Sequence, residues 1–274
     1  MTTRCSPCRP VRGSALALRC GLVGAPGATH SGKPQSGSLW LLQIEHDSTI
    51  TSATEVSAST ASAGLGALLL TDSRFGSAVA SGADFGGLTG LPAVLVGAQG
   101  HNGKGAVFVL RVSNALSATS VTVLDSSSPP FTALQTGDRL GSAVAVLADL
   151  DANGAPELAI GAAGSENGGA VFVCFMHTSG ALISAVRLDR SQPLLTPVLS
   201  PGFEFGAAVS AVTPTSDGEF RNILVGAPGA AVGQVGSGAL FQIRLDGNGS
   251  GLAVAPIGAY QGGLRTAVGP GSRI

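Results

Sequence analysis

Charge, aromatic residues and long apolar runs are all scarce in this chain of 274 residues. Charged residues make up 11% of the sequence and the net charge is −1. Because binding to phosphates needs clustered Lys and Arg, this composition argues against nucleic acid as a partner. Every apolar run is interrupted by Gly, Asp or Ser well before the ~20 residues that a membrane-spanning helix needs, so we expect no membrane span. The mean hydropathy is nevertheless +0.38, which indicates an unusually apolar interior.

Cysteine is sparse as well, with four residues at positions 5, 8, 20 and 174. The Cys5-x-x-Cys8 pair has no second pair at metal spacing, so we interpret it as loose thiols rather than a zinc or redox site. Residues 1–19 begin with a basic stretch, and Arg19 ends a short apolar patch before it reaches the length of a signal peptide. We therefore expect a disordered or mis-started leader, with the natural N-terminus missing.

Glycine, by contrast, is abundant, with 41 residues ordered into three recurring phrases. The first, here called the aromatic phrase, has the form G-A-[VL]-F and occurs at 105–108, 169–172 and 238–241, with a divergent copy at 37–40. The second, the V-G-A phrase, occurs at 23–27, 96–100, 160–164 and 225–229. The third, the F-G phrase, occurs at 75–79, 140–144 and 205–209. A fixed period of about 65 residues indicates one supersecondary unit repeated in tandem.

Each unit is predicted to contain four strands. In the best copy, apolar runs bounded by Gly, Pro, Asn and Asp predict strands at 140–147, 157–162, 169–175 and 181–188. The third strand is continuously apolar, which indicates a sheet covered on both faces. Tandem four-stranded units of this kind pack as radial blades, so the predicted fold is an all-β β-propeller of antiparallel blades. The equivalent aromatic residues are then expected to fill one slot between adjacent blades: Trp40, Phe108, Phe172 and Phe241.

The predicted units span residues 20–70, 71–135, 136–200 and 201–262, and residues 269–274 form a tail. Residues 20–44 supply the second and third strands of a unit that lacks its first strand. Residues 264–268 resemble the first strand at 140–144 and are expected to complete that blade. Two architectures remain open at this stage, a small closed ring and a partial arc of a larger ring.

One loop carries a chemical signature. Between the first and second strands of the third unit, oxygen-bearing side chains occupy positions 1, 3, 5 and 9 of a loop with glycine at position 6. This spacing predicts a Ca²⁺ site, with a backbone carbonyl as ligand at position 7. The predicted ligands are Asp149, Asp151, Asn153, the carbonyl of Ala155, and Glu157. The alternative is an acidic hairpin turn, because Asp, Asn and Gly favour turns. The corresponding loops at 84–91 and 213–219 lack the acidic set.

Taken together, the F-G phrase, the D-x-D-x-N-G-x-x-E-L loop and the V-G-A-P-G phrase resemble the FG-GAP repeats of integrin α-subunit β-propellers over roughly residues 20–268. The resemblance implies a calcium-stabilised extracellular propeller used in adhesion, with the five loop ligands above. Integrin propellers typically have seven blades, whereas four units are recognisable here. The chain also lacks the D-x-S-x-S motif of an inserted adhesion domain. It is therefore similar to an integrin repeat domain without being an integrin subunit.

The function expected from these features is binding without catalysis. Loops after the V-G-A phrase vary in length and sequence, as a binding surface on a rigid scaffold does, and we expect a protein or glycan ligand there. These loops lie at about 28–36, 99–104, 163–168 and 229–237. The four histidines, at positions 30, 46, 101 and 177, are interpreted as solvated loop residues. Asn248-Gly249-Ser250 is a glycosylation sequon if the protein is secreted by a eukaryote.

Two alternatives remain. The first is an enzyme of the lyase, hydrolase or phospholipase type, because charged residues precede the first strand at equivalent positions and could converge near the axis. These residues are Asp72, Arg74, Asp138, Arg139 and Glu204. Their repetition favours a structural role over a unique catalytic one. The second alternative is a truncated scaffold that is completed by missing blades or a partner subunit.

Overall fold

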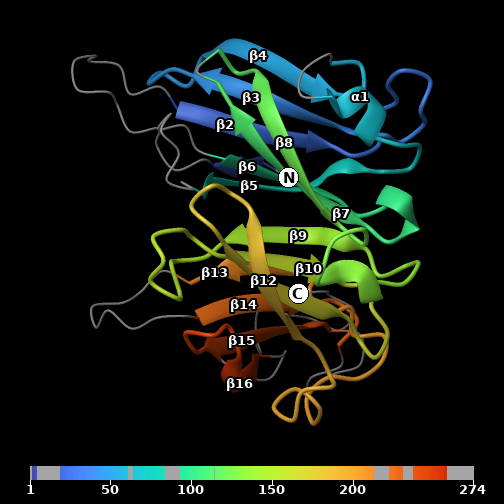
Figure 1. The fold of residues 1–274 in the computed structure, drawn as a ribbon, viewed down its shortest axis with the longest axis vertical. Helices are drawn as coiled ribbons and strands as arrows, with labels where there is room; N and C mark the ends of the chain where they lie inside the picture. Colours follow the sequence, from blue (N-terminus) through green and yellow to red (C-terminus); the bar gives the residue numbers. More distant parts are fainter. Residues whose placement is uncertain are drawn as a thin grey trace.

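The chain folds into four antiparallel sheets, each built from four consecutive strands (Figure 1). The computed structural model describes residues 2–4, 19–60, 64–83, 93–113, 115–212, 222–230 and 237–257. Sheet 1 contains β1 (Thr2–Arg4), β2 (Arg19–Ala25), β3 (Ser38–Ile44) and β4 (Ile50–Ser57). Sheet 2 contains β5 (Phe75–Ala83), β6 (Ala93–Ala98), β7 (Ala106–Val112) and β8 (Ala118–Asp125). Sheet 3 contains β9 (Leu140–Val146), β10 (Leu158–Ala162), β11 (Ala170–Met176) and β12 (Leu182–Leu188). Sheet 4 contains β13 (Ala208–Ala211), β14 (Asn222–Ala227), β15 (Ala239–Leu245) and β16 (Gly251–Ile257).

Helical structure is minimal in the described residues. It consists of α1 (Leu65–Leu68) and two single 3₁₀ turns, η2 (His101–Gly103) and η3 (Phe131–Ala133). The prediction of an all-β chain is confirmed, and the four strands predicted for the third unit match β9 to β12 within one or two residues at their ends. No helix among these residues is long and apolar enough to span a membrane.

The edge of sheet 1 differs from the expected arrangement. Thr2–Arg4, within the segment expected to be a leader, pairs antiparallel with β2 and takes the place of the first strand. Arg19, the last residue of that expected leader, already begins β2. Residues 264–268, which were expected in this position, lie outside the described part of the chain. The edge of β2 is therefore covered by a strand from the N-terminal end of the chain and not by the expected C-terminal segment.

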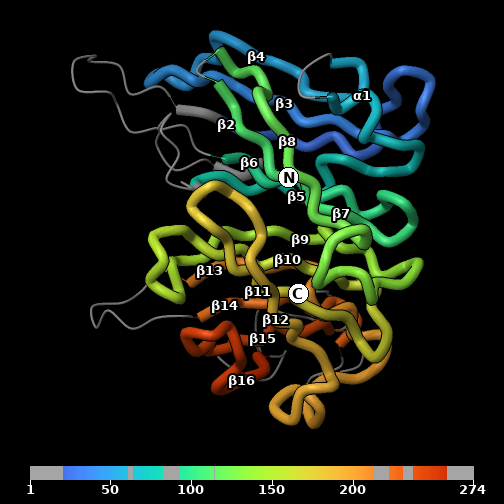
Figure 2. The backbone as a smooth tube through the Cα atoms, viewed as in Figure 1, coloured from blue at the N-terminus to red at the C-terminus, as the bar shows by residue number. Residues whose placement is uncertain are grey.

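The sheets follow one another in chain order, from sheet 1 to sheet 4 (Figure 2). Three apolar clusters of described residues separate them: one between sheets 1 and 2, one between sheets 2 and 3, and one between sheets 3 and 4. Each cluster holds an edge-to-face pair of phenylalanine rings. These pairs are Phe75–Phe108 at 5.3 Å, Phe131–Phe172 at 5.2 Å and Phe205–Phe241 at 5.6 Å between centroids. Sheets that are apolar on both faces explain why strands such as β11 show no alternation of polar residues.

The three glycine phrases meet where consecutive sheets touch. Gly37, Gly105 and Gly169 of the aromatic phrase form single parallel bridges to Phe75, Leu140 and Phe205 of the next sheet. Their φ values are +84°, +94° and +97°, in the left-handed region that favours glycine. A methyl group on Gly161 of the V-G-A phrase would overlap the carbonyl oxygen of Gly206. The period in the sequence is therefore the period of close backbone contact between sheets.

The slot expected for the aromatic residue is filled by a buried ring in sheets 2, 3 and 4, whereas the equivalent ring in sheet 1 is exposed. Phe108, Phe172 and Phe241 are buried, with exposed fractions of 0%, 4% and 0%. Trp40 at the equivalent position in sheet 1 is 36% exposed, so the expectation of four equivalent buried rings is wrong for this residue. The reason is that each ring packs against the preceding sheet, and no described sheet precedes sheet 1.

A hollow lies beside the first strands of the sheets. It has a volume of about 460 Å³ and is lined by β5, β9, β13 and the end of β2. Its walls are made of small residues and valine, including Gly24, Ser77, Ser142 and Ala208. All four sheets therefore direct their first or second strand toward one common space.

Candidate metal centre

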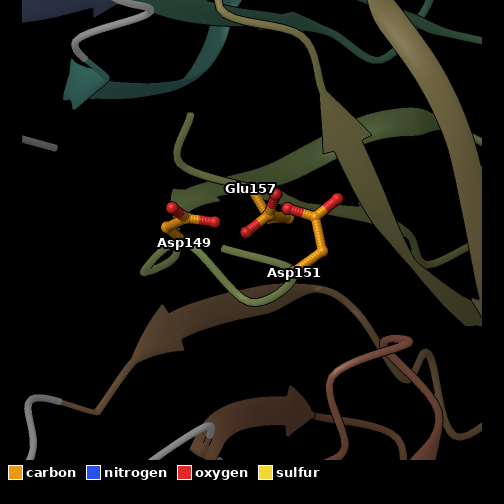
Figure 3. Close-up of side chains that lie close together, drawn as sticks. All are labelled: Asp149, Asp151 and Glu157. Atoms are coloured by element: carbon orange, nitrogen blue, oxygen red, sulfur yellow. The ribbon is translucent and has the colours of Figure 1, made fainter. Parts of the chain in front are cut away.

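The acidic loop joins β9 to β10, and the hydrogen bonds between these two strands fix the positions of its ends. Leu147 and Glu157 continue the pairing of β9 with β10, because the Leu147 amide donates to the Glu157 carbonyl at 2.7 Å. The intervening residues turn back at Ala152 and Gly154, which have φ values of +61° and +88°. Among the described residues, Asp149, Asp151 and Glu157 each offer one carboxylate oxygen, and these three oxygens lie within 4.8 Å of one another. Figure 3 shows the three side chains together. Three of the predicted ligand side chains therefore converge.

Glu157 is the unusual member of this cluster. Its side chain is fully buried, one oxygen accepts a hydrogen bond from the Leu150 amide at 2.5 Å, and the other, Oε1, has no hydrogen-bond partner. Burial raises the pKa of Glu157 to about 7; the Leu150 hydrogen bond opposes the shift, and the charges of Asp151 and Asp149 add to it. A buried carboxylate oxygen without a donor is costly, and a cation beside it would remove that cost.

Asp149 and Asp151 are exposed and are held by the amides of their own loop. Asp149 accepts hydrogen bonds from the Asn153 amide at 3.1 Å and the Gly154 amide at 2.8 Å. Asp151 accepts from the same Asn153 amide at 3.1 Å. These hydrogen bonds are compatible with a Ca²⁺ site and with a plain acidic turn, because both use the same backbone geometry.

Asn153 and Ala155, the other two predicted ligands, make contacts that differ from those of the three carboxylates. The Asn153 side-chain oxygen accepts from the Ala155 amide at 2.7 Å, and its NH₂ group donates to Asp151 at 3.0 Å and to the Met176 carbonyl at 3.0 Å. In this arrangement Asn153 braces the loop against the end of β11. Ala155 is fully buried beneath the turn. The loops predicted to have lost their ligands, at 84–91 and 213–219, lie outside the described residues.

The charged residues that precede the first strands do not gather into a reactive centre among the described residues. Arg139 forms an ion pair with Glu204 at 2.9 Å, which links sheets 3 and 4 at their rim. Asp138 is buried and accepts a hydrogen bond from the Gln135 amide at 2.9 Å. Asp72 and Arg74 are exposed, with φ values of +58° and +55°. These contacts agree with the structural role that repetition suggested.

His101 has polar neighbours, Ser73 and Asp125, which its sequence surroundings did not predict. It was expected to be solvated, yet it is 5% exposed; its Nδ1 lies 3.1 Å from the Ser73 hydroxyl and its Nε2 lies 4.0 Å from Asp125. Burial lowers the pKa of His101, and the charge of Asp125 partly opposes this shift. Ser73 is fully buried and its oxygen also accepts from the Leu70 amide at 2.9 Å, so these side chains link the segment before β5 to the β6–β7 loop and the end of β8.

The other histidines and the sequon have few contacts among the described residues. His30 lies 3.0 Å from a Glu55 oxygen, His177 hydrogen-bonds to Ser179 at 2.9 Å, and His46 is exposed. Asn248 is exposed at the tip of the β15–β16 hairpin. Cys5 and Cys8 lie outside the described residues.

The protonation of Glu157 predicts a pH dependence of stability in the presence of a chelator. Its pKa is about 7 in the folded chain against a reference of 4.5, so the folded state binds more protons between these values. The free energy of unfolding should therefore fall as the pH rises from about 4.5 to about 7, by up to ~3 kcal/mol from this group. Denaturant titrations across this range measure the effect. Glu157→Gln should flatten the slope, and an unchanged slope in that variant would contradict the assignment.

Comparison with known proteins adds no assignment, since no protein-family model and no curated protein matches the chain.

Proposed function

We propose that this chain is a calcium-stabilised binding module without catalytic activity, built as an arc of β-propeller blades similar to FG-GAP repeats. The observation that carries the proposal is the buried Glu157 oxygen without a hydrogen-bond partner, beside the carboxylates of Asp149 and Asp151. Calcium prefers several oxygen ligands, and these three carboxylates would hold it. Bound there, the ion would offset two of the three neighbouring negative charges and fix the β9–β10 loop.

The propeller interpretation is supported by the arrangement of the sheets. Antiparallel sheets of four strands follow one another and turn their first strands toward one hollow, as blades do around an axis. The exposed Trp40 favours an arc over a closed ring of four blades.

The ligand-binding face would be the one opposite the cation. The acidic loop precedes β10, whereas the variable loop at 163–168 follows it, so the two lie at opposite ends of the same strand. The corresponding loops at 28–36 and 99–104 follow β2 and β6 in the same way. We infer a protein or glycan ligand at this face, outside the cell, where calcium reaches millimolar concentrations.

Calcium is therefore expected to raise the melting temperature. With a dissociation constant of ~10⁻³ M, ~10 mM calcium adds about 1.4 kcal/mol, which corresponds to a rise of roughly 3–5 °C for a chain of this size. Thermal unfolding followed by circular dichroism, with calcium and with chelator, measures it.

The matched variants separate a specific site from general ionic effects. Replacing both Asp149 and Asp151 with alanine should abolish the calcium response, whereas Glu166→Gln, which removes an exposed carboxylate from another loop of sheet 3, should keep it. An equal response in the double variant would rule out this loop as the site.

A further inference from the structure

The three interfaces between consecutive sheets are built from two kinds of face. The leading face of one sheet, which points to the following sheet, has aliphatic residues at four equivalent positions. These are Leu22, Leu39, Leu41 and Val56 in sheet 1; Leu95, Val107, Val109 and Leu124 in sheet 2; and Ala159, Val171, Val173 and Leu188 in sheet 3. The trailing face of the next sheet presents an aromatic ring with two apolar neighbours. These are Val96, Phe108 and Leu110; Ile160, Phe172 and Cys174; and Val225, Phe241 and Ile243.

Each end of the row keeps one of these faces without a partner in the described residues. The trailing face of sheet 1 has the full pattern in Val23, Trp40 and Leu42, with Trp40 36% exposed and the other two half-buried. The leading face of sheet 4 keeps three of its four aliphatic positions, as Leu224, Leu240 and Ile257. All three are half-buried. The fourth position is Gln242, which is exposed. The two end faces are therefore of the kinds that pack together inside the molecule.

Opposite charges accompany these two faces. The exposed Asp47 lies in the hairpin that joins β3 to β4 in sheet 1. Arg244 follows Gln242 on the leading face of sheet 4 and is exposed. Arg111 takes the same position in sheet 2 as Arg244 in sheet 4, and its guanidinium donates to the Ser179 carbonyl in the β11–β12 hairpin of sheet 3 at 2.8 Å. The same contact made by Arg244 on a facing sheet 1 would bring it to the β3–β4 hairpin, beside the Asp47 carboxylate.

We propose that the occupant of the trailing face of sheet 1 is the leading face of sheet 4 from a second copy of this chain. The contact repeats the interfaces already present within the chain and adds the pairing of Asp47 with Arg244. It is heterologous, since the two surfaces differ. Made twice between two copies, it joins four sheets and four sheets into one ring of eight, which lies within the range of blade numbers that propellers adopt.

Trp40 is the only tryptophan of the chain, so its fluorescence reports directly on the proposed interface. As the concentration of the intact chain rises from about 1 to about 100 µM, sedimentation should change from monomer to dimer. Trp40 emission should shift to shorter wavelength over the same range, with weaker quenching by acrylamide. A monomer with exposed Trp40 at all concentrations would overturn the proposal. So would a monomer with protected Trp40, because the face would then be covered within the chain.

Variants distinguish the heterologous contact from a symmetric contact of two Trp40 faces. Trp40→Arg and Leu240→Asp should each abolish the closed dimer. An equimolar mixture should form a heterodimer, because one intact trailing face and one intact leading face remain. Ile183→Asp, which alters an exposed residue of β12 away from both faces, should dimerise as the parent does. Leu240→Asp that dimerises alone with Trp40 protected would show the symmetric contact and overturn the proposal.

Charge reversal tests the same contact without touching apolar residues. Asp47→Arg and Arg244→Glu should each weaken association at least about tenfold, and the double variant should restore it to within about threefold. Both side chains are exposed, so folding should persist, with unchanged circular dichroism as the control. Equal weakening in the single and double variants would place the two charges apart and contradict the arrangement.

Discussion

Gly161→Ala is expected to destabilise the protein by about 3 kcal/mol or more, lowering the melting temperature by roughly 10 °C. A methyl group at this position would overlap the carbonyl oxygen of Gly206 in the next sheet. The obstructing atom belongs to the backbone, and Gly206 itself has a φ of +95° and sits against Ala170. No side chain can rotate away, so sheets 3 and 4 must separate. Denaturant and thermal unfolding at low micromolar concentration measure the loss.

Gly226→Ala is the matched control, because it alters the same position of the V-G-A phrase in sheet 4. A methyl there would approach the Ala208 methyl at 3.1 Å, and Ala208 lies on the exposed edge strand β13, which can shift by a few tenths of an ångström. The expected loss is under about 1 kcal/mol. Equal losses in both variants would mean that local strand conformation, rather than the approach of the next sheet, requires glycine.

Much of this fold follows from local features of the sequence. The run Ala170–Met176 is apolar throughout and directly follows two glycines, which is enough to locate a strand buried on both faces. The acidic loop was predictable for a similar reason, since the spacing of Asp149, Asp151 and Glu157 within nine residues sets which oxygens can converge.

Features that depend on distant partners were not predictable. His101 looks like any loop histidine in sequence, and its burial depends on Ser73 and Asp125, which are 28 and 24 residues away. The only local signal was its place directly after the V-G-A phrase, where the equivalent residue Ser165 is also buried. The Asn153 amide contacts a carbonyl at the end of β11, 23 residues away, so its bracing role could not be read from the loop spacing.

Phe108→Ala is expected to lower the free energy of unfolding by about 3–5 kcal/mol, whereas Trp40→Ala at the equivalent position should lower it by only about 1 kcal/mol. Phe108 is fully buried between sheets 1 and 2, with edge-to-face contacts to Phe75 at 5.3 Å and His101 at 5.5 Å between ring centroids. Its removal would leave a cavity lined by two sheets that cannot close around it. Trp40 is 36% exposed, so its truncation leaves space that water can enter.

Comparing the two variants at different protein concentrations also separates folding from association. At about 1 µM, where the chain is expected to be monomeric, the difference between Phe108→Ala and Trp40→Ala should be largest. At about 100 µM the cost of Trp40→Ala should rise, because the parent then gains stability from the second copy while this variant does not. The cost of Phe108→Ala should stay nearly constant, since its ring packs within one chain. A large cost for Trp40→Ala at the lower concentration would mean that Trp40 is already buried in the monomer, and that the row of sheets does not end at its face.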